Sequence, residues 1–174
     1  MTKIELLKAA QKSFAVQDVY LCDANLWANR DYEPGTPVSS SSVQFKLSPT
    51  NNCQVIELQP PQPGVRFLVR YYVGTGLRLL APGVDPHDPG VTRDKLIADI
   101  EATFVARYLV IGDEQPSSAM LEAFNENAVH HVWPYWREFL QAAALRLRVP
   151  PVVLPMREPA KVPAAEPAHE NAID

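Results

Sequence analysis

The residue types best suited to chemistry lie in one short stretch, Asp85-Pro86-His87-Asp88-Pro89. Two carboxylates around an imidazole could bind a cation or act as acid and base. An aspartate beside a proline is more often a turn former, so the stretch favours a structural loop. A small-molecule-binding or enzymatic α+β domain that uses the His87 loop stays open as an alternative function.

Histidine and cysteine give no second chemical centre. His130 and His131 are adjacent, so on a helix they point about 100° apart and cannot chelate one ion without further ligands. Cys22 and Cys53 have no CxxC spacing and no neighbouring histidine, which is typical of reduced structural thiols in the cytosol. We therefore predict no metal site and no cofactor.

Other catalytic motifs are missing from the sequence. It contains no GxSxG, HExxH, Walker-type or GxGxxG pattern, and each of these is a compact solution to a definite chemical problem. The sequence thus predicts no catalytic residues, and we expect a protein that is not an enzyme.

Charge and hydropathy argue against two classes of partner. The net charge is −4 over 174 residues, and no run of lysine and arginine forms a basic stripe, so nucleic acid is not an expected partner. Residues 1–15 lack the uninterrupted apolar core of a signal peptide, and no window approaches the roughly 18 apolar residues of a membrane span. We expect a cytoplasmic protein without membrane insertion.

The elements that position these residues begin with a short helix over Lys3 to Ser13. Thr2 can cap this helix, with Glu5 as its capping-box partner. Alternation predicts a long strand over Val16 to Ala28, with every second residue from Tyr20 on one face. Residues 29–42 hold two prolines, a glycine and a serine run, and therefore predict a crossover connection.

Three more strands are predicted from alternating apolar residues. One begins at Val43 and resumes over Cys53 to Leu58 after a turn-like stretch. The next runs from Val65 to Val73, after which Gly74 and Gly76 loosen it near its end. The most regular alternation, Leu96 to Tyr108, predicts the fourth strand, with Leu96 on its apolar face.

Two helices are predicted at the end of the folded part. The serine pair at 117–118 can cap a short helix through Phe124, which the following Asn-Glu-Asn breaks. A main helix then runs from Asn127, available as its cap, to Val149. Pro134 lies in its first turns or at a kink.

The order of helix, four strands and helices predicts an α+β fold. We expect a four-stranded antiparallel sheet with the long C-terminal helix packed on one face. The chain divides into an N-terminal helix at 1–15, a folded domain at 16–156 and a flexible Pro/Ala-rich tail at 157–174.

The main helix is apolar on more than one side, so one sheet cannot bury all of it. Its second neighbour is either another subunit or another part of the same chain, and we expect the subunit, in a homo-oligomer. The side chains predicted at this interface are Trp133, Tyr135, Trp136, Phe139, Leu140 and Ala143.

The stretch from Asn125 to Met156 resembles the SecB protein-export chaperones. The main helix of that family carries an Asn-Ile-Leu-Phe-Pro-Tyr-Ala-Arg-Glu motif and is followed by a segment that ends in Leu-x-x-Pro-Val. The matching residues here are Asn127, Pro134, Tyr135, Arg137 and Glu138, with Leu154 and Pro155 closing the segment.

The resemblance implies an ATP-independent holdase that binds unfolded or nascent polypeptides in apolar grooves, for protein export and translocation. It implies dimers that pair into a tetramer, with the long helices between the sheets. Trp27 and Tyr32 would be peptide-binding groove walls. Asp23 and Glu101 match acidic positions that dock the motor SecA.

The chain departs from the family in two places. The family's second amphipathic helix and acidic tail have no counterpart after Met156, and Trp27 stands at an acidic docking position. Two interpretations of such a chaperone stay open: an export chaperone that engages SecA, and a SecB-like chaperone of a toxin–antitoxin system that serves the antitoxin.

Overall fold

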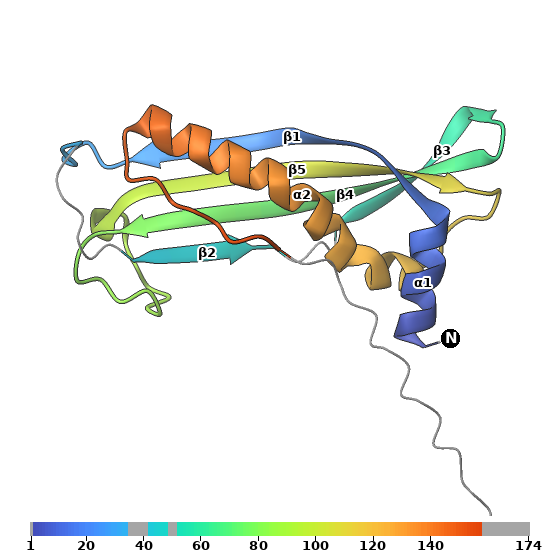
Figure 1. The fold of residues 1–174 in the computed structure, drawn as a ribbon, viewed down its shortest axis with the longest axis horizontal. Helices are drawn as coiled ribbons and strands as arrows, with labels where there is room; N and C mark the ends of the chain where they lie inside the picture. The colour runs from blue at the N-terminus through green and yellow to red at the C-terminus, as the bar shows by residue number, and fades with distance from the viewer. Residues whose placement is uncertain (1, 35–41, 49–51, 158–174) are drawn as a thin grey trace, which may run out of the picture.

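The computed structural model of the chain describes residues 2–34, 42–48 and 52–157. Two helices lie on one face of an antiparallel sheet, which confirms the predicted α+β class (Figure 1). The predicted tail lies outside the described residues, apart from Arg157. The elements in chain order are α1 (Lys3–Ser13), β1 (Phe14–Ala28), β2 (Val43–Leu47), β3 (Cys53–Gln62), β4 (Val65–Leu80), the short 3-10 helix η1 (Arg93–Lys95), β5 (Leu96–Ile111) and α2 (Ser118–Leu147).

The described part of the sheet has five strands rather than the predicted four. Its order is β1-β5-β4-β2, and β3 also pairs with β4. β2 pairs with residues 75–79 of β4, whereas β3 pairs mainly with residues 67–71. The predicted second strand is therefore divided in two on the same edge of β4, and the sequence between the halves holds a proline and two asparagines, which favour turns.

The central strand β4 does not end at its glycines, so that prediction was wrong. β4 continues through Gly74 and Gly76 to Leu80. A Cβ at Gly74 would meet the Ser48 side chain at 3.2 Å, and one at Gly76 would meet Lys46 at 3.2 Å. The glycines thus leave room for side chains of the β2 region to cross β4.

Two irregularities in β1 change which residues share a face. The register between β1 and β5 shifts between Val16 and Asp18 and again between Leu21 and Asp23. Leu21 and Leu26 therefore lie on the same face, although an even number of intervening residues would place them on opposite faces of a regular strand. Strict alternation, which grouped Leu26 with Tyr20, was wrong because a bulge reverses the side-chain order.

The C-terminal helix is one element, not the predicted two. Ser117 caps it by accepting a hydrogen bond from the Met120 backbone N–H at 3.3 Å, and the helix then runs without a break through residues 125–127. Asn127 is a buried interior residue and not a cap, since burial of neighbours such as Phe124 and Val132 outweighs the weak helix propensity of asparagine. Pro134 lies inside the helix on its exposed side.

The core lies between α2 and the central strands β4 and β5. Tyr71, Tyr108 and Phe124 meet there with ring centroids 5.1–5.9 Å apart, and Phe14 joins them at 5.0 Å from Phe124. The Tyr71 hydroxyl donates to the Leu121 carbonyl at 3.0 Å. This packing holds α2 against the helix-covered face of the sheet.

The N-terminal helix is formed as predicted. Thr2 and Glu5 make the reciprocal capping box, with bonds of 3.3 and 2.7 Å. Leu7 and Ala10 are buried, and α1 packs against the N-terminal half of α2 (Figure 1). Within the described part of the chain, no helix is both long and apolar enough to cross a membrane.

Candidate functional site

The helix-covered face of the sheet exposes apolar side chains on both sides of α2. The register pairs Leu21 with Phe104 and Phe45 with Leu77, and both partners are buried under α2, so Leu21 and Phe45 point to the same side. We call the exposed large apolar residues of β1 on this side, Val16, Leu21 and Leu26, the β1 margin. Their counterparts on β2, Phe45 and Leu47, form the β2 margin.

The margins are exposed because one helix is narrower than this sheet. A helix with its side chains is about 10 Å across, whereas neighbouring strands lie about 4.8 Å apart, so one helix covers about two strands. α2 crosses the sheet obliquely, in contact with β5, β1 and β4, and leaves parts of the outer strands open (Figure 1). The Phe45 side chain is 55% exposed as a result.

An extended C-terminal segment, residues 149–157, forms the second wall of the β2 margin. It runs back alongside α2 on the β2 side (Figure 1). Leu154 is buried in the core, whereas Val153 and Met156 are each 77% exposed. Exposed apolar side chains therefore border this margin from both β2 and the C-terminal segment.

Three polar contacts anchor the C-terminal segment on α2. The Trp133 indole donates to the Pro155 carbonyl at 2.8 Å. Arg157 forms an ion pair with Glu126 at 2.6 Å and lies over the Trp133 ring, and the Arg137 guanidinium contacts the Met156 sulfur. Together with buried Leu154, these contacts hold the segment antiparallel to the helix.

Within the described residues, the outer edge of β2 has unpaired backbone groups next to its apolar side chains. Leu80 N–H donates to the Ser42 carbonyl and Ser48 N–H donates to the Gly74 carbonyl, both at 2.9 Å. Even-numbered residues of β2 therefore bond to β4, and the backbone groups of Phe45 and its odd-numbered neighbours face outward. A strand edge with adjacent apolar side chains is what an added extended peptide requires.

The two predicted groove residues, Trp27 and Tyr32, lie on opposite faces of the sheet. Tyr32 packs against the main core. Trp27 packs on the other face, beside Leu80 and Leu96, with the Arg93 guanidinium 4.9 Å from its ring. Leu96 thus lies on the face opposite to its predicted one, because the ladder shifts at Leu80. The structure does not bring Trp27 and Tyr32 together.

The two predicted docking carboxylates do share a surface. Asp23 pairs with Thr103 and Asn25 with Glu101 across β1 and β5, which places both acids on the helix-free face. They line a hollow of about 130 Å³ together with Lys46, whose ammonium lies 3.0 Å from the Glu101 carboxylate. Asp23 has no ion-pair partner within the described residues.

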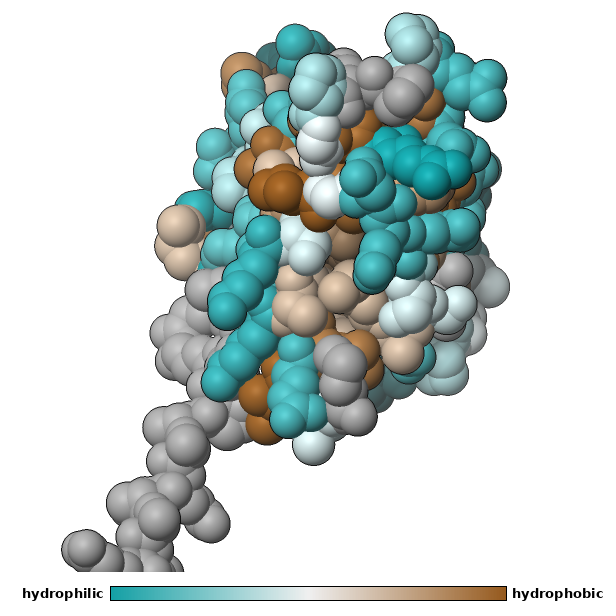
Figure 2. Space-filling view, turned by 90° about the vertical axis from the view of Figure 1, so that its right-hand side faces the viewer, coloured by the Kyte–Doolittle hydropathy of each residue, from teal (hydrophilic) through white to brown (hydrophobic). Residues whose placement is uncertain are grey.

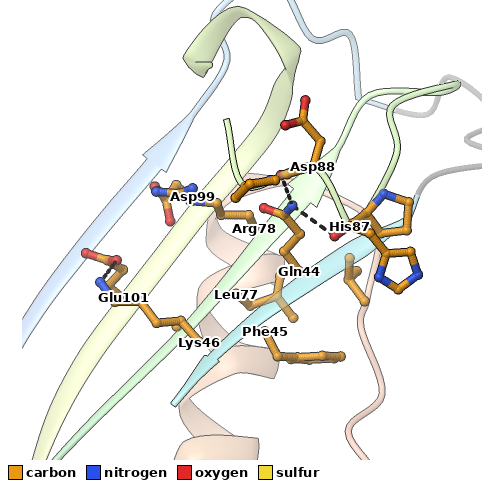
Figure 3. A pocket seen from close by; sticks show the side chains of 13 residues that line it. Gln44, Phe45, Lys46, Leu77, Arg78, His87, Asp88, Asp99 and Glu101 are labelled. Carbon is orange, nitrogen blue, oxygen red and sulfur yellow. Dashed lines mark hydrogen bonds and ion pairs between the residues drawn. The ribbon is translucent and has the colours of Figure 1, made fainter. Parts of the chain in front are cut away.

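The His87 loop borders a cavity of about 690 Å³ on the helix-free face (Figure 3). The Gln44 amide ties the loop to β2 by donating to the Pro86 and Asp88 carbonyls at 2.9 and 2.8 Å. The Asp85 and Asp88 carboxylates accept from the backbone N–H groups of His87 and Gly90. Both acids therefore stabilise their own turns, as the sequence indicated.

Two ion pairs lie within this cavity. Arg78 lies 3.5 Å from Asp99, yet burial outweighs this neighbour and raises the pKa of the Asp99 carboxyl. Glu101 pairs with Lys46. No group of three His, Cys, Asp or Glu side chains that could hold a metal ion occurs within the described residues.

The predicted interface residues of α2 divide by exposure. Trp136, Leu140 and Ala143 are buried in the chain's own core. Trp133 and Phe139 are partly buried and pack on that core, whereas Tyr135 is 44% exposed. Tyr135 therefore has the most surface left for a neighbouring subunit, and the interface stays a prediction.

The end of the molecule near α1 has a smaller apolar area. Figure 2 views this end and shows hydrophobic surface framed by hydrophilic side chains. A hollow of about 380 Å³ lies here between α1 and the end of β5, and Leu6, Ile111 and Met120 are among its lining residues. Ile111 is exposed.

Sequence reasoning missed the margins as functional surface. Alternation identified Phe45 and Leu47 as an apolar face, but such a face is normally assigned to the core. The sequence did contain a signal for the margins. It predicts several strands but one long helix, and one helix cannot cover the apolar face of every strand.

Comparison with known proteins identifies the architecture. No protein-family model matches the sequence, and no curated protein matches it significantly. Among solved structures, the chain is similar to the Rv1957 SecB-like chaperone of Mycobacterium tuberculosis, in complex with a ChAD peptide from the Rv1956 HigA1 antitoxin. The TM-score is 0.64 at 16% identity, over 90% of this chain and 99% of that chain. The chain has a SecB-like fold.

The resemblance noted around Pro134 and Tyr135 thus coincides with a likeness that covers most of the chain. Within the described residues, this SecB-like fold continues after α2 as the extended C-terminal segment and not as a second long helix.

Proposed function

We propose that this chain is an ATP-independent chaperone, a holdase that binds unfolded or nascent polypeptides. The observation that carries the proposal is the β2 margin, where the exposed Phe45 and Leu47 side chains adjoin a free strand edge within a SecB-like fold. An extended apolar client would add to the β2 edge through backbone hydrogen bonds and place alternate side chains against the margin.

The exposed side chains of the C-terminal segment would widen this site. Met156 and Val153 border it from the α2 side, and the flexible thioether of methionine adapts to varied apolar partners. Such a surface selects for apolar, extended sequence rather than for one shape. No nucleotide is needed, because binding and release follow from affinity alone.

The β1 margin serves a second copy of the chain in this proposal. Within the described residues, the outer edge of the 15-residue strand β1 is unpaired, and Val16, Leu21 and Leu26 are exposed on its helix side. A long open edge with apolar side chains pairs readily with another chain. A dimer through β1, and a tetramer through the exposed side of α2 around Tyr135, would cover these surfaces.

The test is suppression of aggregation. Light scattering of a thermally unfolding protein, in the absence of nucleotide, should fall when the full chain is added. Phe45→Asp should abolish most of this effect, because a charge enters the apolar site. His87→Ala should leave it unchanged. If the purified chain is a monomer and does not delay aggregation, the proposal is contradicted. If His87→Ala loses the suppression of aggregation and Phe45→Asp keeps it, the small-molecule or enzymatic alternative is favoured.

A dedicated chaperone of a toxin–antitoxin system is the second candidate. It is favoured by the solved complex of the similar SecB-like chaperone with a peptide from an antitoxin. Titration of a panel of apolar peptides discriminates the candidates: a dedicated chaperone binds one antitoxin segment far more tightly than the rest, whereas an export chaperone binds many with similar affinity.

SecA is the partner that distinguishes the export function. Asp23 and Glu101 are the proposed docking carboxylates, and both lie on the helix-free face. Asp23→Lys should reduce binding to SecA while aggregation suppression is retained. A cytoplasmic location follows from either version of the proposal, because nascent chains, SecA and antitoxins are all met there.

A further inference from the structure

The helix-free face of the sheet carries two arginines at its centre. Arg70 of β4 and Arg107 of β5 are direct cross-strand partners, so their side chains project from the same face. The next pair along the ladder, Tyr71 and Ala106, is buried under α2, which places the arginines on the opposite side. Like charges directly opposite each other destabilise a sheet unless an anion compensates them.

Within the described residues, carboxylates compensate this pair only in part. Arg107 lies 3.3 Å from Asp18, an exposed residue of the edge strand β1. Arg70 has no ion pair or hydrogen bond within the described residues. The Nε atoms of both arginines are buried without a hydrogen-bond partner in that part of the chain. The pair therefore keeps positive charge on a chain whose total is −4.

The surroundings of the pair resemble the centre of a protein interface. Leu68 and Val105 lie on the same face and are buried, although neither described helix lies on that face. Tyr20 and Tyr72 flank Val105 on the adjoining strands. Tyrosine and arginine around buried aliphatic residues are the composition enriched at binding hot spots.

We propose that Arg70 and Arg107 form a docking site for an acidic segment of a partner protein. A carboxylate between the two guanidinium groups would accept charge-assisted hydrogen bonds from both and remove their repulsion. The site lies on the face opposite the β2 margin, so the partner and a client bind at the same time. In the oligomer proposed above, the helices lie between the sheets and this face stays outermost.

A nucleic acid fits this face less well than an acidic peptide. A polyanion requires a continuous basic stripe. The same face continues along β5 and β1 into Glu101, Asp99 and Asp23, which would repel the next phosphates. A short carboxylate-bearing segment can end at the arginine pair and avoid these acids.

The experiment uses fluorescein-labelled octaglutamate, titrated with the full chain at low salt and followed by fluorescence anisotropy. The wild-type chain should bind, and its affinity should fall as salt rises. Arg70→Ala should weaken binding about tenfold, since a charge-assisted contact is lost. Arg66→Ala is the matched control: Arg66 is an exposed arginine of the same strand, already paired with Glu57 at 2.9 Å, and should change the affinity by less than about twofold.

Arg70→Lys keeps the proposal testable if the alanine variant fails to fold. Lysine retains the charge but not the planar fork, so an affinity between those of wild type and alanine is expected. Absence of octaglutamate binding by the wild-type chain, or equal binding by a folded Arg70→Ala variant, would overturn the proposal. Tighter binding of a single-stranded DNA oligonucleotide of equal charge would also overturn it, in favour of nucleic acid.

Discussion

The Tyr108 hydroxyl and Nδ1 of His131 lie 2.8 Å apart and join the C-terminal part of β5 to α2. Burial raises the pKa of the Tyr108 phenol, so this hydroxyl stays protonated and can donate. Burial, and then the neighbouring His130, lower the pKa of the His131 imidazole. A neutral imidazole that accepts the Tyr108 proton is therefore the folded form near neutral pH.

This pair predicts a loss of stability in mild acid. The pKa of His131 is lower in the folded state than in the unfolded state, whose value is about 6.5. The unfolded state thus binds a proton first, and the free energy of unfolding decreases as the pH falls from about 6.5 through the lowered folded pKa. Denaturant unfolding measured at closely spaced pH values should show this slope.

His131→Gln is the control for the pH prediction. Its amide oxygen can still accept from Tyr108, but it does not titrate, so the variant should lose part of the acid slope and keep its stability at neutral pH. Identical slopes for wild type and variant would show that other groups, such as carboxylates, cause the whole effect.

The C-terminal segment should depend more on Leu154 than on its hydrogen bond to α2. Leu154 is 2% exposed, so Leu154→Ala should cost about 2–3 kcal/mol of unfolding free energy through the cavity it leaves. Trp133→Phe removes the indole donor to the Pro155 carbonyl and keeps a smaller aromatic ring for the contacts with Arg157 and the core. Because that carbonyl can reach water, the loss should be about 1 kcal/mol or less. Urea unfolding compares them, and a larger loss for Trp133→Phe would contradict the assigned order.

Local rules were enough for some elements and not for others. The Thr2–Glu5 capping box and the Ser117 cap were predictable because each is completed within three residues. The continuity of α2 through Asn127 was not predictable, because tertiary burial of Val132 and its neighbours decides it. The reversed faces of β1 depend on bulges, which leave no distinct sequence pattern.

In the candidate site, too, some features were predictable from the local sequence and others depend on tertiary structure. Alternation correctly gave Phe45 an apolar strand face, but its exposure depends on how much of the sheet one helix covers. The predicted wall residues Trp27 and Tyr32 were separated by the sheet itself, because the strand's irregular register decides which way Trp27 points. Asp23 and Glu101 were brought together as expected for neighbouring strands.

Substitutions at two adjacent residues of α2 should affect folding and assembly differently. Trp136 is 1% exposed in the isolated chain, so Trp136→Ala should cost about 3–5 kcal/mol of folding free energy. Tyr135 is 44% exposed, and Tyr135→Ala should change the folding free energy by about 0.5 kcal/mol or less. If the exposed side of α2 is the subunit interface, Tyr135→Ala should still shift the oligomer to a smaller species in light scattering coupled to size exclusion. If the Tyr135→Ala variant keeps the mass of the wild-type oligomer on dilution, Tyr135 is not part of the interface.

Backbone pairing at the β2 edge can be tested separately from side-chain burial. The odd-numbered residues of β2 face their backbone groups outward, so a bound client strand should donate alternate N–H groups to the edge. N-methylation of two alternate residues in a client peptide removes these donors, and at about 1 kcal/mol for each lost bond the affinity should fall about 10- to 30-fold. Moving both methyl groups by one residue places them on the solvent side of the bound strand, where calorimetry should find nearly unchanged affinity. Because the two peptides have the same composition and hydrophobicity, equal affinities would mean that clients bind the margin through side chains alone and do not extend the sheet.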